Sequence, residues 1–285
     1  MEELKTHLKT RWIKKYTRNL REIENLKYLI TLNPKLIPSI KTITKKYYII
    51  ENYKKINPVD FDPLNFYNLY FNLLKSLYKF KRRSFTPGIY KYFAPSYSLS
   101  REIKKQCYIP YILNQLKKII WNILIRFPKL LNDATFVNLF KYLESNGKRL
   151  KKWKPPEGYR LLHGDLHMGN IVKRDNNFFL IDFEYLRYGA VELEISNLII
   201  SLLIWHYRSN PDNKKLTRLN IGYFEVCNNL RFFDKNTFKF FFIFALILFH
   251  LSLYLKRDWI GLKAIQQITR ISKIPKVKSI DFLAE

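Results

Sequence analysis

Cysteine is scarce in this chain of 285 residues, where only Cys107 and Cys227 occur. Two isolated cysteines supply neither a disulfide framework nor the paired spacing of a metal site. The N-terminus begins Met-Glu-Glu-Leu, so it lacks the basic segment followed by an apolar segment that marks a signal peptide. These absences predict a cytoplasmic protein with reduced thiols.

Acidic residues are also scarce, with 23 Asp and Glu against 51 Lys and Arg, and the formal net charge is +28. A charge of this size creates a strong field that favours anionic partners. Basic residues concentrate at 79–83, 148–154 and 214–218. We interpret these runs either as solvated surface that reflects overall composition, or as patches that meet phosphates on an anionic membrane or glycan surface. Nucleic-acid binding is a third, less favoured interpretation, because it rests on charge alone.

A long uninterrupted apolar run is missing as well. Residues 240–255 come closest, but His250 and Ser252 interrupt the run, and Lys239 and Lys256 flank it. That leaves it short of the ~20 residues that span a bilayer. With 47% hydrophobic residues the chain can bury a sizeable core. We therefore predict that this segment is a buried helix, in which His250 is a hydrogen-bonded core residue.

The most informative pattern is LLHGDLHMGN at 161–170, followed by FLIDFE at 179–184. Asp165 and Asn170 lie five positions apart, and Asp182 follows Asp165 by seventeen positions. This is the order and spacing of the protein-kinase catalytic loop and metal-binding Asp-Phe. Any one of these residues alone would be a weak signal, but together they predict phosphoryl transfer.

The chemistry of that reaction explains the residue types. Phosphoryl transfer needs positioning and neutralised charge more than covalent help. A carboxylate at Asp165 can orient an acceptor hydroxyl and take its proton. Asp182 and Asn170 offer hard oxygen ligands for Mg²⁺, with ATP phosphates supplying others. We interpret His163 as a residue that bonds the loop backbone, whereas His167 either shapes the loop or touches the acceptor.

Local patterns place this segment between strands. Residues 159–162 read as a strand, and 170–173 with 178–183 as a hairpin around the polar turn 174–177. Pro- and Asp-rich residues 57–63 read as a linker. Helices are predicted at 110–131, at 135–146 with Gly147 closing it, and at 192–207.

The stretch HGDLHxGN at 163–170 resembles the catalytic loop of the aminoglycoside phosphotransferase and choline kinase superfamily, and IDFEY at 181–185 is especially similar to choline and ethanolamine kinases. The resemblance implies an α+β, protein-kinase-like two-lobe fold, with a small truncated N-terminal lobe at 1–56 and a large, mostly helical C-terminal lobe at 57–285. It also implies ATP and Mg²⁺ as cofactors. Where the family usually has an Asp that braces the catalytic loop, this chain has the longer Glu194.

Glycine is scarce too, with eight in the chain and none before Gly88, so the glycine-rich loop that kinases fold over the phosphates is missing. The resemblance assigns Glu22 to the helix Glu that pairs with a strand Lys, assigns that Lys to Lys9, and places Glu51 at the hinge that holds the nucleotide. Apolar residues also recur at helical spacing over residues 2–32, so one long helix competes with a strand around Lys9.

The acceptor stays open between two hydroxyl classes. A cell-envelope sugar, such as a phosphorylated lipopolysaccharide core, suits the positive charge, which would repel polycationic aminoglycosides. An amino-alcohol such as choline or ethanolamine suits the local signature, if Glu184, Tyr185 and Tyr188 form an ammonium box and do not simply pack the metal loop. A kinase-like binding protein without turnover is the alternative, motivated by the missing glycine loop. A peripheral contact at the inner face of a membrane is a further expectation, and the oligomeric state is open.

Overall fold

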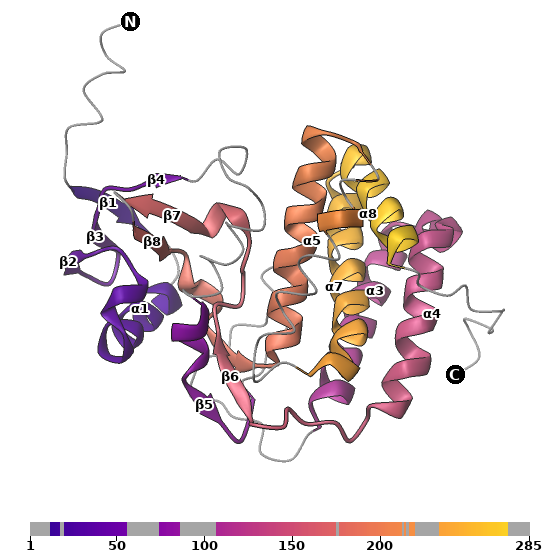
Figure 1. Cartoon of the computed structure of the whole chain (residues 1–285), viewed down its shortest axis with the longest axis horizontal. Helices are drawn as coiled ribbons and strands as arrows, with labels where there is room; N and C mark the ends of the chain where they lie inside the picture. Colours follow the sequence, from indigo (N-terminus) through magenta and orange to yellow (C-terminus); the bar gives the residue numbers. More distant parts are fainter. Residues whose placement is uncertain are drawn as a thin grey trace, which may run out of the picture.

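The computed structural model describes residues 12–17, 20–55, 74–85, 107–174, 177–212, 214, 217–219 and 234–272. Lys9 and the predicted linker at 57–63 lie outside these ranges. Small sheets with one helix form one side of the molecule, and a bundle of long helices forms the other (Figure 1). The segment 163–170 lies between them, so both parts can contribute to one site.

The N-terminal part is a three-stranded antiparallel sheet covered by a helix. The sheet contains β1 (Trp12–Tyr16), β2 (Ile40–Ile43) and β3 (Tyr47–Glu51) in the order β1-β3-β2. The helix α1 (Leu20–Leu32) buries Ile23, Leu26 and Leu29, and it is followed by the short η2 (Pro34–Leu36). The long helix considered for residues 2–32 is therefore wrong over β1, because every residue of that strand pairs with β3. Sheet pairing has overridden the local helical periodicity.

Two further small sheets lie on either side of the segment 163–170. One has the order β4-β7-β8, from Lys54–Lys55, Ile171–Arg174 and Asn177–Leu180. Its β7 and β8 pair from Ile171↔Leu180 to Arg174↔Asn177, which confirms the predicted hairpin. The other has the order β5-β6-β9, from Lys81–Arg82, Tyr159–Leu162 and Arg187–Gly189. The short turns η5 (Met168–Asn170) and η6 (Phe183–Tyr185) complete the region.

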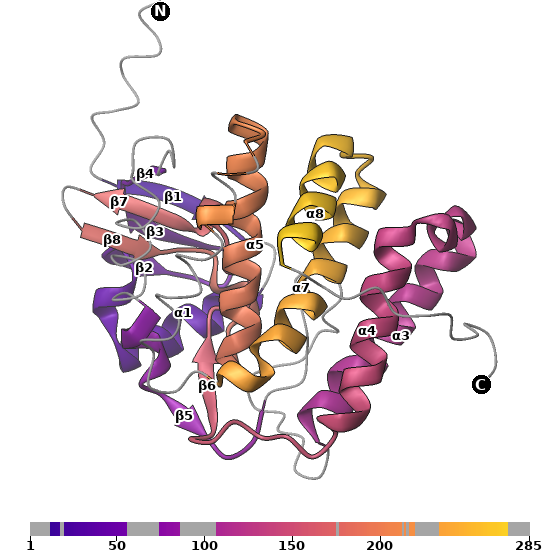
Figure 2. The ribbon, with the colours of Figure 1, turned by 45° about the vertical axis from the view of Figure 1, so that its right-hand side comes forward.

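The helical part contains α3 (Tyr108–Arg126), η4 (Pro128–Asn132), α4 (Ala134–Arg149), α5 (Val191–Ser209), α7 (Lys235–Leu255) and α8 (Trp259–Ile271). α7 is central and packs against α4, α5 and α8, as Figure 2 shows. Its window Thr237–Leu255 has the length and mean hydropathy (2.1) of a membrane span, but 72% of that window is buried within the protein. The predicted buried helix is thus confirmed. His250 is fully buried on it, with Nε2 2.9 Å from Asp133 Oδ2.

Two predicted helix ends were wrong for steric reasons. The helix predicted at 110–131 ends at Arg126, and Pro128 starts the separate turn η4, because proline disfavours helical backbone at the residue before it. Gly147 does not close α4, which runs on to Arg149. A Cβ at Gly147 would overlap the Cδ1 atom of Leu113, so the glycine permits close packing of α3 on α4.

Candidate active site

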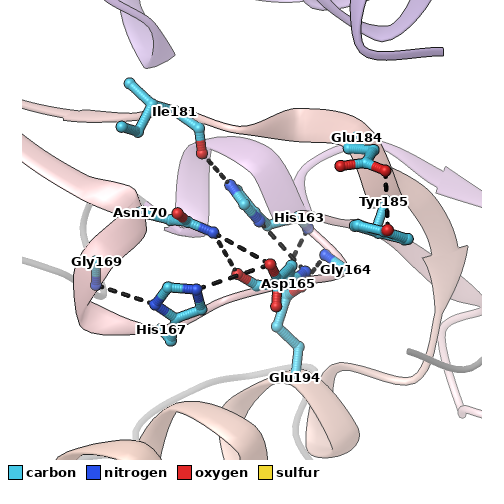
Figure 3. A network of polar contacts seen from close by, with 10 residues as sticks. All are labelled: His163, Gly164, Asp165, His167, Gly169, Asn170, Ile181, Glu184, Tyr185 and Glu194. Carbon is cyan, nitrogen blue, oxygen red and sulfur yellow. Dashed lines mark hydrogen bonds and ion pairs between the residues drawn. The ribbon is translucent and has the colours of Figure 1, made fainter. Parts of the chain in front are cut away.

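The loop after β6 is fixed from within by His163, whose side chain is fully buried and makes the contacts drawn in Figure 3. Its Nε2 lies 2.8 Å from the carbonyl oxygen of Ile181, and its Nδ1 accepts a hydrogen bond of 3.3 Å from the backbone N–H of Asp165. Burial lowers the pKa of His163 to about 4, so the ring is neutral near pH 7. A neutral ring with the proton on Nε2 satisfies both contacts. His163 therefore ties the loop to the residue before Asp182, and both of its ring nitrogens are occupied.

Glu194 holds the same loop from the first turn of α5. Its Oε1 accepts from the backbone N–H of His163 at 3.1 Å and from the Tyr78 hydroxyl at 3.0 Å. Its Oε2 accepts from the backbone N–H of Gly164 at 2.6 Å. Burial raises the pKa of Glu194 to about 7, although these donors favour the charged form. The longer carboxylate thus makes the bracing contacts that the sequence assigned to it.

Gly164 stands where protein kinases have Arg, and the backbone geometry gives the reason. Its φ is +85°, which is the left-handed region that glycine enters without steric cost. A Cβ at this position would overlap the carbonyl oxygen of Tyr185. The catalytic loop and the turn η6 therefore approach each other closely only because residue 164 has no side chain.

Asp165, Asn170 and Asp182 come together at the centre of the site. The Nδ2 of Asn170 donates to the backbone oxygen of Asp165 at 2.8 Å and to its Oδ2 at 3.5 Å. The backbone oxygen of Asn170 accepts from the N–H of Ile181 at 3.0 Å, which brings Asp182 next to it. Asp182 has a φ of +68°, in the left-handed region that most non-glycine residues avoid and that is found often at active sites.

These residues suit Mg²⁺ by their chemistry. The Asn170 amide nitrogen is engaged by Asp165, which leaves its side-chain oxygen, with the Asp182 carboxylate, as hard oxygen ligands. Within the described ranges, no group of three or more His, Cys, Asp or Glu could hold a metal ion by itself.

The N-terminal sheet presents a lysine to this centre. Lys15 Nζ on β1 lies 3.1 Å from Oε1 of Glu22, and the Tyr48 hydroxyl donates to the same oxygen at 2.7 Å. Burial raises the pKa of Tyr53, and the charges of Lys15, Asp182 and Glu22 also act on that group. The lysine, the glutamate and the candidate metal ligand therefore all lie near enough to one tyrosine to act on its charge.

The sequence assigned the lysine partner of Glu22 to Lys9, which lies outside the described residues, and among the described residues this partner is Lys15. The available signal was the short segment WIKKY, whose second lysine precedes Glu22 by seven positions.

The helix α1 also contacts the turn η6, which follows Asp182. Asn25 Nδ2 donates to the backbone oxygens of Phe183 at 2.6 Å and of Glu184 at 3.3 Å.

Two other predictions from the sequence concern Glu51, placed at the hinge, and the ammonium box that includes Tyr188. The carboxylate of Glu51 is buried in an ion pair with Arg174, so its side chain joins β3 to β7. Tyr188 is buried, its hydroxyl lies 2.9 Å from that of Tyr28, and the guanidinium of Arg82 covers its ring at 4.5 Å. One face of the Tyr188 ring is thus already covered by a cation, and the ammonium box of Glu184, Tyr185 and Tyr188 stays a prediction.

A cavity of about 400 Å³ extends from the catalytic loop into the helical part. His167 lies at its catalytic end, with Nε2 3.7 Å from Asp165 Oδ2 and with Nδ1 accepting from the N–H of Gly169 at 3.0 Å. The lining residues are Asp165, His167, Ser201, Ile204, Trp205, Arg208, Leu248, Phe249, Ser252, Leu253, Lys256 and Asp258. Sequence reasoning missed this wall because α5, α7 and α8 bring it together only in the folded chain.

A kinase-type loop between a small sheet and a helical bundle defines the class of protein-kinase-like phosphotransferase folds. The family model described as "Phosphotransferase enzyme family" matches residues 125–233. Both the predicted fold class and the resemblance to this superfamily are thereby confirmed. No curated protein sequence matches the chain.

Solved structures agree with the fold. A ternary complex of a thermostable aminoglycoside phosphotransferase APH(4)-Ia mutant with ADP and hygromycin B is 12% identical, covers 94% of this chain and 88% of that one, and has a TM-score of 0.59. The amicoumacin kinase hAmiN, in complex with AMP-PNP, Ca²⁺ and Ami, is 13% identical, with coverages of 93% and 82% and a TM-score of 0.53. An ethanolamine kinase of Plasmodium vivax, at 16% identity and a TM-score of 0.44, adds nothing on the acceptor.

Proposed function

We propose that this chain is an ATP- and Mg²⁺-dependent phosphotransferase that acts on a hydroxyl group of a small molecule or a cell-envelope sugar. One observation carries the proposal. Asp165 lines one end of a cavity, and the loop that bears it is braced by Glu194. The side chain of Asn170 donates to the backbone oxygen of Asp165, and the N–H of Ile181, next to Asp182, donates to the backbone oxygen of Asn170. A binding protein without turnover would have no need of this arrangement.

The roles follow from position. Asp165 faces the cavity and takes the proton of the acceptor hydroxyl. The acceptor oxygen bonds to the γ-phosphorus of ATP while the bond from that phosphorus to the β–γ bridging oxygen breaks, and ADP leaves. Lys15, oriented by Glu22, donates hydrogen bonds to phosphate oxygens in the absence of a glycine-rich loop. When bound by Asn170 and Asp182, Mg²⁺ supplies positive charge to the phosphates.

The cavity wall favours a sugar hydroxyl over an amino-alcohol. Arg208 and Lys256 line it together with two carboxylates, Asp165 and Asp258, and Asp258 is paired with Arg208. A lining without excess negative charge offers a cationic acceptor no net attraction and suits a neutral one. Trp205 and Phe249 provide apolar faces for a sugar ring.

Transfer of the labelled γ-phosphate of ATP tests the proposal. The protein is incubated with Mg²⁺ and a panel of neutral sugars, phosphorylated sugars, amino-alcohols and aminoglycosides. We expect transfer to a sugar class, and loss of transfer in Asp165→Asn. Stabilisation by ATP and Mg²⁺ without transfer to any acceptor, and with equal ATP hydrolysis in Asp165→Asn, would instead support the binding protein.

A further inference from the structure

The exposed large apolar side chains of the helical part gather at one of its ends. Within the described residues they are Trp121, Ile125, Phe127, Leu131, Leu255, Trp259 and Ile260. They belong to the last turns of α3, to η4, and to the junction of α7 with α8, which lie at the same end of the bundle (Figures 1 and 2). We call this surface the docking end. A ring contact of 6.3 Å between Phe127 and Tyr254 joins its two halves.

The exposure is large for such side chains. Trp121 exposes 62% of its surface, Ile125 68% and Trp259 64%. Isolated exposed apolar residues are normal, but a cluster of this size at one place marks an interaction surface. The exposed face of α3 also alternates these residues with basic ones, since Lys118 precedes Trp121 and Arg126 follows Ile125.

Basic side chains surround the apolar ones. The exposed ones at the docking end are Arg126, Lys129, Lys256, Arg257 and Lys263. Two of the described carboxylates nearby are engaged: Asp133 binds His250 and the first amides of α4, and Asp258 pairs with Arg208. A third, Asp212, is exposed and accepts from the N–H of Lys214. Positive charge therefore dominates this end.

We propose that the docking end binds the surface of an anionic lipid bilayer. Tryptophan prefers the membrane–water interface, and aliphatic side chains beside it can enter the acyl boundary. Lysine and arginine next to them gain from the negative potential of anionic headgroups. The docking end combines both features on one rigid surface.

Other occupants fit less well. A second copy joined through the same surface would place Arg126, Lys129 and Arg257 against one another across a two-fold axis, and like charges repel. A nucleic acid would satisfy the basic residues but would leave Ile125 and Ile260 in water, because stacking uses aromatic rings.

The docking end also adjoins the cavity. Lys256 and Asp258 line the cavity and belong to the α7–α8 junction, and the cavity extends from there to Asp165. A docked protein would thus hold its cavity close to the headgroups. This link, unlike the docking itself, rests on the proposed function, and it points to a hydroxyl on a lipid-borne acceptor.

Co-sedimentation of the full chain with vesicles tests the docking. The vesicles contain phosphatidylcholine alone, or phosphatidylcholine mixed with phosphatidylglycerol. We expect binding to the mixed vesicles at low salt. Arg126→Gln with Lys129→Gln should weaken the binding about 30-fold, because both basic residues contribute about equally to the attraction toward the anionic headgroups. Trp121→Ser with Ile125→Ser should weaken it by about tenfold or more.

Matched controls lie elsewhere on the protein. Lys148→Gln with Arg149→Gln makes the same charge change at the opposite end of α4, within the basic run noted in the sequence. Leu20→Ser removes another exposed apolar side chain, on α1. Both should bind vesicles like the parent protein. ATP turnover should be unchanged in all these variants, so a failed docking test leaves the proposed function standing.

Three results would overturn the inference. The parent protein could fail to bind mixed vesicles, or the control variants could lose as much binding as the docking-end variants. The parent could also elute as a dimer that Trp121→Ser with Ile125→Ser converts to a monomer, which would make this surface an interface between copies.

Quenching of tryptophan fluorescence by brominated lipid gives an independent check. It should occur in the parent and fall strongly in Trp121→Phe with Trp259→Phe, and unchanged quenching would contradict insertion of these side chains.

Discussion

The catalytic loop and the N-terminal sheet supply the same site in opposite ways. The loop is buried and bonded at nearly every step: His163, Gly164, Asp165 and Asn170 each have a backbone or side-chain partner inside the protein. The sheet offers Lys15 from its edge strand β1, with 30% of that side chain exposed.

Substitutions in the two regions should therefore differ in their effects on stability and on rate. Changes in the loop remove buried hydrogen bonds and should affect both stability and rate. Changes at Lys15 remove an ion pair whose lysine is 30% exposed, and the Tyr48 hydroxyl still donates to the buried Glu22. Changes in the sheet should therefore affect the rate more than the stability, and the following changes test this separation.

The largest effect is expected at the candidate metal ligands. Asp182→Asn and Asn170→Ala should each lower the ATP turnover rate by at least about a hundredfold, because a metal ligand stabilises charge in the transition state. Turnover measured across a Mg²⁺ titration checks this. If either variant keeps the parent rate at the parent Mg²⁺ requirement, that residue is not a ligand.

Lys15→Met should lower kcat/KM roughly 10- to 100-fold, the range for losing a charge-assisted hydrogen bond. The melting temperature should stay near that of the parent. Lys14→Met is the matched control, since Lys14 lies on the same strand with Nζ 3.8 Å from the Tyr47 ring centre. A comparable loss in Lys9→Met, with Lys15→Met active, would restore the assignment made from the sequence.

Gly164→Ala should destabilise the fold by about 1–3 kcal/mol, because the new Cβ meets backbone that cannot move aside. Gly169→Ala is the control, since its Cβ would meet only the end of the His167 side chain. Chemical denaturation compares the two. Equal stability of both variants would show that the close approach of loop and turn is not required.

The smallest effect concerns pH. The folded pKa of Glu194 is raised to about 7 from 4.5, so its contribution to stability is full below about 4.5 and is lost as the pH rises through about 7. The melting temperature of the parent minus that of Glu194→Gln should therefore fall between pH 5 and pH 8. His163 and Glu192 titrate alike in both proteins and cancel in the difference. A difference that rises with pH would contradict a raised pKa.

Much of the loop could be predicted because its chemistry is local in sequence. Asp165, Asn170 and Asp182 fall within one strand–loop–hairpin segment, so their spacing carries the signal. The pairing of Lys15 with Glu22 could not be identified from the sequence, because several lysines precede Glu22 and the apolar residues around them follow a helical period. Only pairing with β3, which is distant in sequence, makes that segment a strand.

The cavity wall could not be predicted for a similar reason. Trp205 and Arg208 come from the last turns of α5, and Lys256 follows α7. Their proximity depends on how the helices pack, which no local pattern encodes. The contact between Arg82 and Tyr188 could not be predicted either, because Arg82 lies on a strand distant in sequence.

In the proposed mechanism Asp165 acts on the acceptor, while nucleotide binding depends on other residues. Two readings on the parent and on Asp165→Asn test it together: the thermal shift with ATP and Mg²⁺, and the release or transfer of labelled γ-phosphate. We expect stabilisation of both proteins, ~2.7 kcal/mol at a hundredfold excess over the dissociation constant, with a rate about 10²- to 10⁴-fold lower in the variant. Equal rates in the two proteins would contradict it.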